Sequence, residues 1–389
     1  MPETHGAPRR RDERSQPSRE RDASGRDAPL YGALDLGTNN CRLLIARPSR
    51  DGFRVVDSFS RIVRLGEGLS KTGRLDARAM DRAYDALALC ADRIVRKGVD
   101  SVRLSAVATQ ACRAAENGAE FIDRVRKGTG LRLRIIDPAE EARLAVEGCL
   151  NLIDPKAEGV VIIDVGGGST ELSWLRRDGP NWKTTGWMSA ALGVVTLAER
   201  HPEPEGTSPA DHAQWYETMV ADMGAALAGG GVEDPEMPVV GSGWALRRGG
   251  VELAERLELL RRNRAHLIGT SGAITSLAGI HLKLPRYNRD RVDGLWMTRA
   301  ECEAAAERLK ALGPDGRAKE ACIGPDRADL VLAGAAILEA IQRAWPSERV
   351  RVADRGLREG LLLQQMREAK KPPRRRRRRR GRGRGPGGA

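Results

Sequence analysis

The chain has 389 residues, of which 40% are apolar, so it can bury the cores of two or three domains. It contains no run close to the roughly 20 apolar residues that cross a bilayer, and its first residues do not resemble a secretory signal. We therefore expect no membrane contact and a cytoplasmic location. Six scattered cysteines without a C-x-x-C pair indicate neither a disulfide framework nor a thiolate zinc site.

The net charge of +13 is concentrated at the C-terminal end. Residues 370–389 hold 11 basic and no acidic residues, whereas residues 31–369 hold 48 basic and 47 acidic ones. This Arg/Gly/Pro tail and the mixed-charge arm at 1–30 cannot bury a core, and both are predicted to be disordered. Such a tail can contact RNA or another polyanion without selectivity. An extension without a selected role is the alternative.

Between the two ends, predicted strands and helices alternate. In chain order they are strands at 31–36, 42–47 and 53–59, a helix at 77–98, a strand at 101–109, a helix near 117–128, a strand at 131–137, a helix at 139–153, and strands at 159–165 and 171–176. A further strand and helix follow within 266–282, and residues 242–265 are interpreted as an added basic helical stretch. This alternation predicts an α/β fold with mixed sheets flanked by helices.

Two segments that lie 129 residues apart align without gaps. Residues 35–43 (DLGTNNCRL) match residues 164–172 (DVGGGSTEL). Both have an apolar strand that ends in Asp-x-Gly, then small or polar residues, then a returning strand. The offset is the size of a domain, so we expect two similar domains that each open on a β-hairpin.

Both hairpin loops have the residues of a phosphate cradle. Glycine can adopt positive φ and has no Cβ, so successive backbone N–H groups can converge on an anion. The candidate phosphate-binding residues here are Gly37, Thr38, Asn39, Asn40, Gly166, Gly167, Gly168, Ser169 and Thr170. Asp35 and Asp164 would repel a phosphate unless a cation lay between them, and Mg²⁺ resolves that conflict. For either loop alone, a plain hairpin turn is the alternative.

A third glycine segment repeats the pattern of strand, small residues and helix. Gly269, Thr270, Ser271 and Gly272 follow an apolar strand and precede a helix. The N-terminus of a helix offers unpaired N–H groups and the positive end of its dipole, so this segment could hold a second phosphate or a nucleotide. Ordinary close packing of a helix on a sheet is the alternative.

Taken together, these segments resemble the actin-like phosphotransferase superfamily. Within it, the chain is similar to the exopolyphosphatase and guanosine pentaphosphate phosphohydrolase family. The resemblance rests on DLGTNNCRLLI (35–45), VRLGEGL (63–69), ATQACRAAENG (108–118), EEARL (140–144), DVGGGSTEL (164–172), GTSGAITSLAGI (269–280) and DRGLREGLL (354–362). Thr38 and Asn40 depart from it, because the family commonly has serines there.

The resemblance implies the short, two-domain form of this family. Two actin-like, ribonuclease H-like domains at 31–139 and 140–354 would enclose an interdomain cleft. The helix near 355–369 would pack back on the first domain. Longer members carry a helical C-terminal domain, and here the tail stands in its place. Family members often dimerise, which leaves a homodimer open.

The resemblance also implies hydrolysis of a terminal phosphoanhydride, in inorganic polyphosphate, in guanosine pentaphosphate (pppGpp), or in both. Such a reaction needs a positioned water, a base and neutralisation of phosphoryl charge. Glu141 matches the family's base, and Glu171 matches a carboxylate that binds metal or orients water. Asp35, Asp164 and Glu171 would hold Mg²⁺ or another divalent cation.

Two arginines add to the candidate site residues. Arg42 and Arg113 are candidate phosphate clamps because guanidinium groups match phosphate oxygens, with salt bridges as the alternative.

Two other functions remain open. An ATP-dependent kinase could use the same scaffold, with the third glycine segment at the adenosine. A non-catalytic regulator could instead bind polyphosphate or RNA through residues 370–389.

Overall fold

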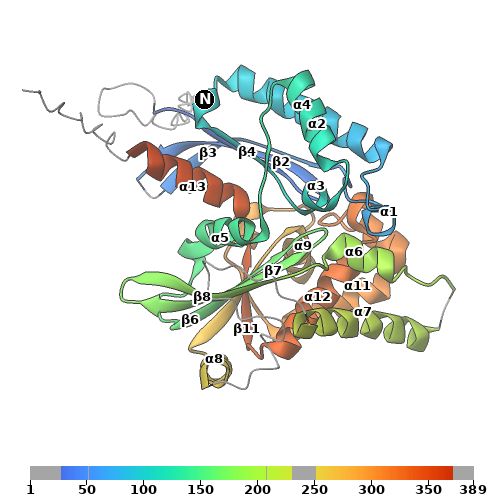
Figure 1. The fold of residues 1–389 in the computed structure, drawn as a ribbon. Helices are drawn as coiled ribbons and strands as arrows, with labels where there is room; N and C mark the ends of the chain where they lie inside the picture. Colours follow the sequence, from blue (N-terminus) through green and yellow to red (C-terminus); the bar gives the residue numbers. More distant parts are fainter. Residues whose placement is uncertain (1–27, 51, 207, 230–250, 371–389) are drawn as a thin grey trace, which may run out of the picture.

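The structure, a computed structural model, describes residues 28–50, 52–206, 208–229 and 251–370. The arm predicted at 1–30 lies almost entirely outside these ranges, as do the tail from residue 371 onward and the first part of the stretch at 242–265. Within the described ranges, none of the helices combines the length and the apolar character that spanning a bilayer requires. The chain forms two α/β halves, one above the other in Figure 1.

The N-terminal half is built on a mixed sheet in the order β3-β2-β1-β4-β5. Its strands are β1 (Tyr31–Leu36), β2 (Asn40–Ser49), β3 (Gly52–Ile62), β4 (Leu104–Ala108) and β5 (Arg134–Ile135). The helices α2 (Ala77–Lys97) and α4 (Gly118–Thr129) cover one face and share a core with it. Two short helices, α1 (Leu69–Thr72) and α3 (Gln110–Ala114), lie at the edge that faces the other half.

The C-terminal half repeats this plan on a six-stranded sheet in the order β10-β11-β9-β6-β7-β8. Its strands are β6 (Gly159–Val165), β7 (Thr170–Asp178), β8 (Asn181–Ala190), β9 (Ala265–Thr270), β10 (Trp296–Thr298) and β11 (Arg349–Ala353). The helices are α6 (Val194–Arg200), α7 (Pro209–Gly229), α8 (Val251–Arg261), α9 (Gly272–His281), α10 (Arg289–Val292), α11 (Arg299–Lys319) and α12 (Val331–Ala344). The largest core lies here, and in it Trp174 stacks on Trp345.

The two hairpins have matching geometry, which confirms the repeat expected from the sequence. In both sheets the first strand pairs antiparallel with the second and parallel with the fourth. Gly37 N donates to Asn40 O at 2.9 Å, and Gly166 N donates to Ser169 O at the same distance. We call residues 37–40 the first hairpin loop and residues 166–169 the second. They end up at the junction of the two halves.

Several element boundaries differ from the prediction. The strand expected at 101–109 begins only at Leu104, because Asp100 accepts a hydrogen bond from Val102 N and caps a 3₁₀ turn over Ser101–Arg103. The strand expected at 131–137 is reduced to β5. β8 is absent from the predicted strands, since its outer half is exposed and lacks a regular apolar alternation. In the described part of the added stretch, α8 covers residues 251–261, and Ala265 already belongs to β9.

Two crossing helices connect the halves on one side. α5 (Pro138–Cys149) begins where the Asp137 side chain accepts from Glu140 N, with Pro138 at the first helical position. α13 (Leu357–Lys370) packs against α5 and the first sheet, and α5 also touches Trp187 of the second sheet. A Cβ on Gly148 would lie 2.0 Å from the main-chain oxygen of Gly356, the residue just before α13, so α5 meets this segment backbone to backbone. The domain boundary between 139 and 140 stays a prediction.

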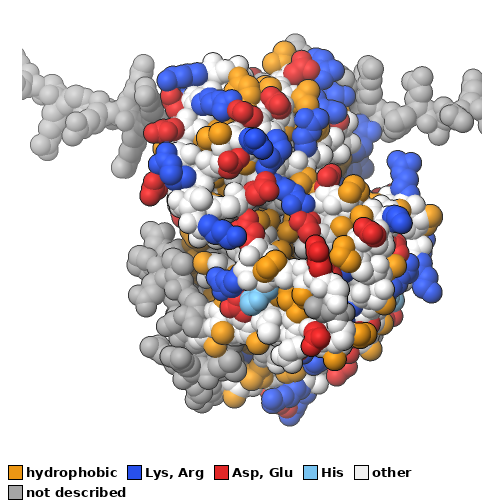
Figure 2. All heavy atoms as spheres, turned by 90° about the vertical axis from the view of Figure 1, so that its right-hand side faces the viewer, with side chains coloured by type: hydrophobic (Ala, Val, Ile, Leu, Met, Phe, Trp, Pro, Cys, Tyr) orange, Lys and Arg blue, Asp and Glu red, His pale blue; other side chains and the backbone are white. Residues whose placement is uncertain are grey.

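On the opposite side, the loop after β3 makes polar contacts that join the two halves. The Arg64 guanidinium donates to both carboxylate oxygens of Asp329, at 2.8 and 2.9 Å. Glu199 of α6 accepts from Gly68 N and from Ser70 Oγ, both at 2.8 Å. Figure 2, which views this side, shows acidic and basic side chains gathered along the line where the halves meet. The junction is therefore held at both edges.

Candidate active site

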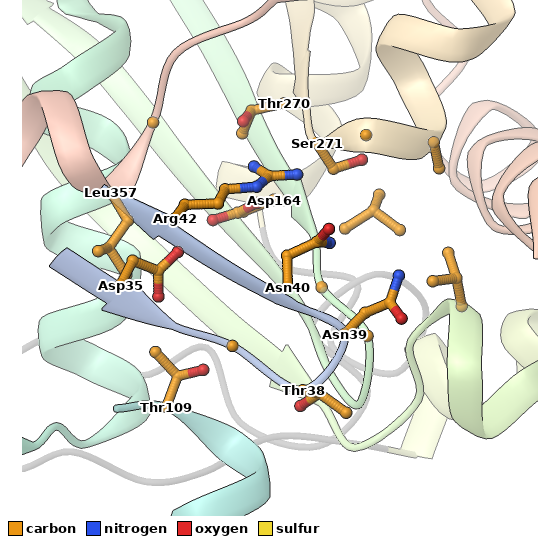
Figure 3. Close-up of a pocket in the computed structure, with 18 of the residues that line it drawn as sticks. Asp35, Thr38, Asn39, Asn40, Arg42, Thr109, Asp164, Thr270, Ser271 and Leu357 are labelled. Carbon is orange, nitrogen blue, oxygen red and sulfur yellow. The ribbon is translucent and has the colours of Figure 1, made fainter. Parts of the chain in front are cut away.

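A central cavity of about 1100 Å³, counting the space open to solvent at its mouth, lies between the two halves. Both hairpin loops, the start of α9 and the start of α13 line it (Figure 3). The predicted site residues that line it are Asp35, Gly37, Thr38, Asn39, Asn40, Arg42, Glu141, Asp164, Gly166, Gly167, Gly168, Ser169, Thr270, Ser271 and Gly272. Four others, Arg113, Thr170, Glu171 and Gly269, do not line it.

The two hairpin loops touch each other at the cavity floor. A Cβ on Gly167 would lie 2.8 Å from Thr38 Cβ and 3.2 Å from Asn39 N. The sequence explained these glycines by positive φ and by the missing Cβ. Only the missing Cβ applies here, because Gly37 and Gly166–Gly168 all lack positive φ. They are needed where a Cβ would push the loops apart. The Thr38 hydroxyl donates to Gln110 Oε1 at 3.0 Å, so its proton is already used.

Two strand-end carboxylates point into the cavity, as Figure 3 shows for Asp35 and Asp164. Burial raises the pKa of Asp164 to about 7, and the charges of Glu171 and Asp35 add to this rise. Burial also raises the pKa of Asp35, against the lowering effect of Arg42. Within the described residues, Asp35 Oδ1 is buried without a hydrogen-bond partner. Both groups therefore favour either a proton or a nearby cation.

Glu141 lies in the first turn of α5 and faces the same cavity. Its Oε2 accepts from Arg113 Nη1 at 3.2 Å, and this same nitrogen donates to Ile136 O at 2.6 Å. Burial raises the pKa of Glu141, the charge of Glu171 raises it further, and Arg113 opposes both. The salt-bridge alternative for Arg113 thus describes its contact in the structure: it holds the carboxylate of Glu141.

Glu171 and Thr170 lie behind the second hairpin loop. Glu171 is 2% exposed and accepts from Ser189 Oγ at 2.8 Å. The Thr170 hydroxyl donates to Leu192 O at 2.7 Å, so it is directed away from a ligand in the cavity. Glu171 therefore acts on Glu141 and Asp164 through its charge, whereas the Thr170 side chain supports the loop.

The start of α9 forms another wall of the cavity. Ser271, just before this helix, has φ 131°, a strained value for a residue with a side chain. A Cβ on Gly272 would lie 3.4 Å from Arg42 Nη2 and 3.5 Å from Arg327 Nη1. Gly269 has a different role, because a Cβ there would lie 3.1 Å from Ile274 Cγ2 of α9. Close packing of helix on strand accounts for that glycine.

Comparison with known proteins identifies the chain. The model of the Ppx/GppA phosphatase family matches residues 44–227 and 251–369. The chain belongs to the Ppx/GppA phosphatase family. This membership supports phosphate hydrolase activity, as the resemblance implied.

Solved structures of similar proteins share the two-domain fold of this Ppx/GppA chain. A family member from Aquifex aeolicus is 24% identical, with a TM-score of 0.65, over 88% of this chain and 99% of that one. An exopolyphosphatase from Cytophaga hutchinsonii is 22% identical, with a TM-score of 0.70, over 88% and 99%. A protein described as exopolyphosphatase-like is 27% identical, with a TM-score of 0.68, over 87% and 99%.

Several residues of this Ppx/GppA site were not predicted from the sequence. They are Thr109, Gln110, Ser276, Arg327, Asp354, Arg355, Gly356, Arg358 and Glu359. Burial lowers the pKa of Arg42, and the charges of Arg358 and, more weakly, of Arg327 lower it further, which shows that the three cations are close. Within the described residues, the side chains of Arg42 and Arg327 have no hydrogen bond or ion pair. The wall that they share is suited to an anion.

The same Ppx/GppA site has few protein ligands for a metal. Among the described residues, no three His, Cys, Asp or Glu side chains are arranged to hold an ion. The expected set of Asp35, Asp164 and Glu171 therefore does not form a closed cage. Mg²⁺ commonly takes one or two carboxylates and completes its shell with water and substrate phosphate. The unpartnered Asp35 Oδ1 and the raised pKa of Asp164 fit that pattern.

Proposed function

We propose that the chain removes the terminal orthophosphate from inorganic polyphosphate, from pppGpp, or from both, through in-line attack of water. The observation that supports this best is the position of Glu141. Its carboxylate is buried, lines the same cavity as the two hairpin loops, and is held by Arg113 at 3.2 Å. A positioned carboxylate next to a phosphate cradle is what hydrolysis with water requires.

Glu141 is the proposed general base. Burial and the charge of Glu171 raise its pKa, which makes its carboxylate a stronger base. Arg113 keeps the side chain oriented and stabilises the ionised form. The carboxylate would then accept a proton from the attacking water as the water approaches the phosphorus.

The hairpin loops are the proposed cradle for the terminal phosphoryl group. The backbone N–H groups of Thr38, Asn39, Gly167 and Gly168 donate no hydrogen bond within the described residues. Backbone N–H groups that converge on an anion stabilise charge at little reorganisation cost. Arg42 would neutralise the phosphate that follows the terminal one, helped by the unpredicted Arg327 and Arg358.

A divalent cation at the strand ends is part of the proposal. We propose that Asp35 and Asp164 hold Mg²⁺, with Glu171 behind them adding negative charge. When bound, the ion would polarise phosphoryl oxygens and offset the repulsion between carboxylate and phosphate. A cytoplasmic location, nonspecific polyanion contact through residues 370–389 and a homodimer are further parts of the proposal.

The proposal is tested by phosphate release from purified protein with Mg²⁺. Short polyphosphate, long polyphosphate and pppGpp are assayed in parallel, and at least one should be hydrolysed. No release from any of the three would refute the hydrolase. ATP with labelled acceptors should show no transfer, which separates hydrolase from kinase. Deleting residues 371–389 should leave release from short substrates intact, whereas a regulator that uses this tail would lose binding.

A further inference from the structure

The Gln110 side chain is inserted between the two hairpin loops. Gln110 is the first residue of α3 and lines the central cavity. Its Oε1 accepts from Thr38 Oγ1 of the first loop at 3.0 Å. A Cβ on Gly168 of the second loop would lie 2.1 Å from that Oε1 and 2.5 Å from Gln110 Cδ. The carboxamide thus touches a loop from each half.

The nitrogen of this carboxamide is available for a ligand. Within the residues that the structure describes, Gln110 Nε2 has no hydrogen-bond partner, and the residue is only partly buried. An amide nitrogen carries two donors, and phosphoryl oxygens are strong acceptors. The cavity wall therefore offers two neutral N–H donors at the point where the loops meet.

The helix that carries Gln110 also contacts the proposed base. Arg113 lies three residues later on α3 and donates to Glu141 Oε2 at 3.2 Å. Residues at this spacing are neighbours on a helix surface, roughly 5–6 Å apart at Cβ. α3 therefore sets Gln110 one helical turn from the residue that orients Glu141.

We propose that Gln110 is a substrate-positioning residue that binds the terminal phosphoryl group only when both loops surround it. Its oxygen holds Thr38, its side chain fills the space that Gly168 leaves, and its N–H groups donate to the phosphoryl oxygens. This inference rests on the proposed hydrolase function. It explains why the second loop has no side chain at 168 and why the hydroxyl of Thr38 is directed at an amide.

Two substitutions separate donation to the substrate from support of Thr38. Gln110→Met removes the oxygen and the donors at similar length, whereas Gln110→Glu keeps an acceptor for Thr38, removes the donors and adds a negative charge beside the phosphoryl oxygens. We expect both substitutions to lower kcat by about 10- to 100-fold, with the larger loss in Gln110→Glu. The inhibition constant of inorganic phosphate should rise in parallel. Gln364→Met on α13 is the matched control and should stay within about twofold of wild type.

A double-mutant cycle tests the contact with the second loop. Gly168→Ala should lower activity, because its methyl group displaces the carboxamide, but Gln110→Ala with Gly168→Ala should be no worse than Gln110→Ala alone. Thermal unfolding checks that each variant folds.

The controls distinguish the possible failures. An inactive wild-type protein contradicts the proposed function and not this inference specifically. An active wild type together with unchanged kcat and phosphate inhibition in Gln110→Glu overturns the inference, since only the tie to Thr38 would then matter.

Discussion

Arg42 and Glu171 occupy the same position in the two β-hairpins but carry opposite charges. Arg42 pairs with Asp35 across β1 and β2, and Glu171 pairs with Asp164 across β6 and β7. The repeat thus places a carboxylate at each strand end but a compensating cation at only one. Negative charge accumulates at the second hairpin, and it adds to burial in raising the pKa of Asp164 and of the neighbouring Glu141.

Glu141→Gln should lower kcat for phosphate release by about 10²- to 10⁴-fold, because the base is lost while the size of the side chain is kept. Substrate binding and the unfolding temperature should change little. Glu140→Gln is the matched control, since Glu140 pairs with Arg134 outside the cavity, and it should retain nearly full activity. Steady-state kinetics decide the matter: near-normal turnover in Glu141→Gln would remove this residue from the mechanism.

Glu171→Gln should shift the acidic limb of the pH–rate profile to lower pH. The base works only when ionised, and the charge of Glu171 is the main neighbouring charge that raises the pKa of Glu141. Removing this charge lets Glu141 ionise at lower pH, even where kcat itself falls. The profile of kcat/KM measures the shift.

Arg113→Gln should move the same limb in the opposite direction. Arg113 lowers the pKa of Glu141, so its removal leaves the base protonated up to a higher pH. Lost orientation of the carboxylate should also reduce kcat. Shifts of the same sign in Arg113→Gln and Glu171→Gln would contradict the electrostatic coupling.

Asp164→Asn should stabilise the apo protein at pH 8 but not at pH 4. The folded-state pKa of about 7 lies above the ordinary value of 3.8, so the cost of ionising Asp164 in the fold builds up as the pH rises from about 4 to about 7 and is complete above that. Below about pH 4 the group is protonated in both states and the effect disappears. The difference between the ordinary and the folded-state pKa corresponds to at most about 4 kcal/mol in the free energy of unfolding. Thermal unfolding without divalent cations at both pH values tests this, and equal changes at the two would contradict it.

Gly167→Ala should reduce activity by at least about 10-fold while the protein still folds. Its methyl group would meet Thr38 Cβ and force the hairpin loops apart, which misplaces the phosphate cradle. Gly224→Ala is the matched control in α7, where a Cβ meets nothing within 4 Å, and it should be neutral or slightly stabilising. Activity and unfolding temperature measured side by side separate the two effects.

The sequence predicted the hairpin repeat because the pattern at 35–43 recurs within one stretch at 164–172. Strand pairing then brings Asp35 and Asp164 to equivalent positions, and the structure confirms this. Glu141 was found through its resemblance to the family, and the structure places it on the cavity wall. Local patterns therefore located the residues that lie next to turns in the chain.

Residues that reach the cavity from distant segments were missed. Arg327 comes from a single turn before α12, and Arg358 from the first turn of α13. Neither follows a loop of several glycines that would mark a phosphate site, although Arg358 lies within the matched segment at 354–362. Gln110 lay within the matched segment at 108–118, but a glutamine has no characteristic motif. Its role becomes visible only when the loops from both halves are placed around it.

The crossing of α5 and α13 has a mechanical consequence for the site. Gly148 meets the main-chain oxygen of Gly356, the residue just before α13, and a Cβ on Gly360 would lie 2.1 Å from Leu144 O, so main-chain atoms make the contact on both sides. A contact between main-chain atoms has no side-chain rotamers that could rearrange. Glu141 lies seven residues before Gly148 on the same rigid helix. A methyl group added at Gly148 or Gly360 would therefore push the main chains of these segments apart and shift Glu141, which lies two helical turns from Gly148.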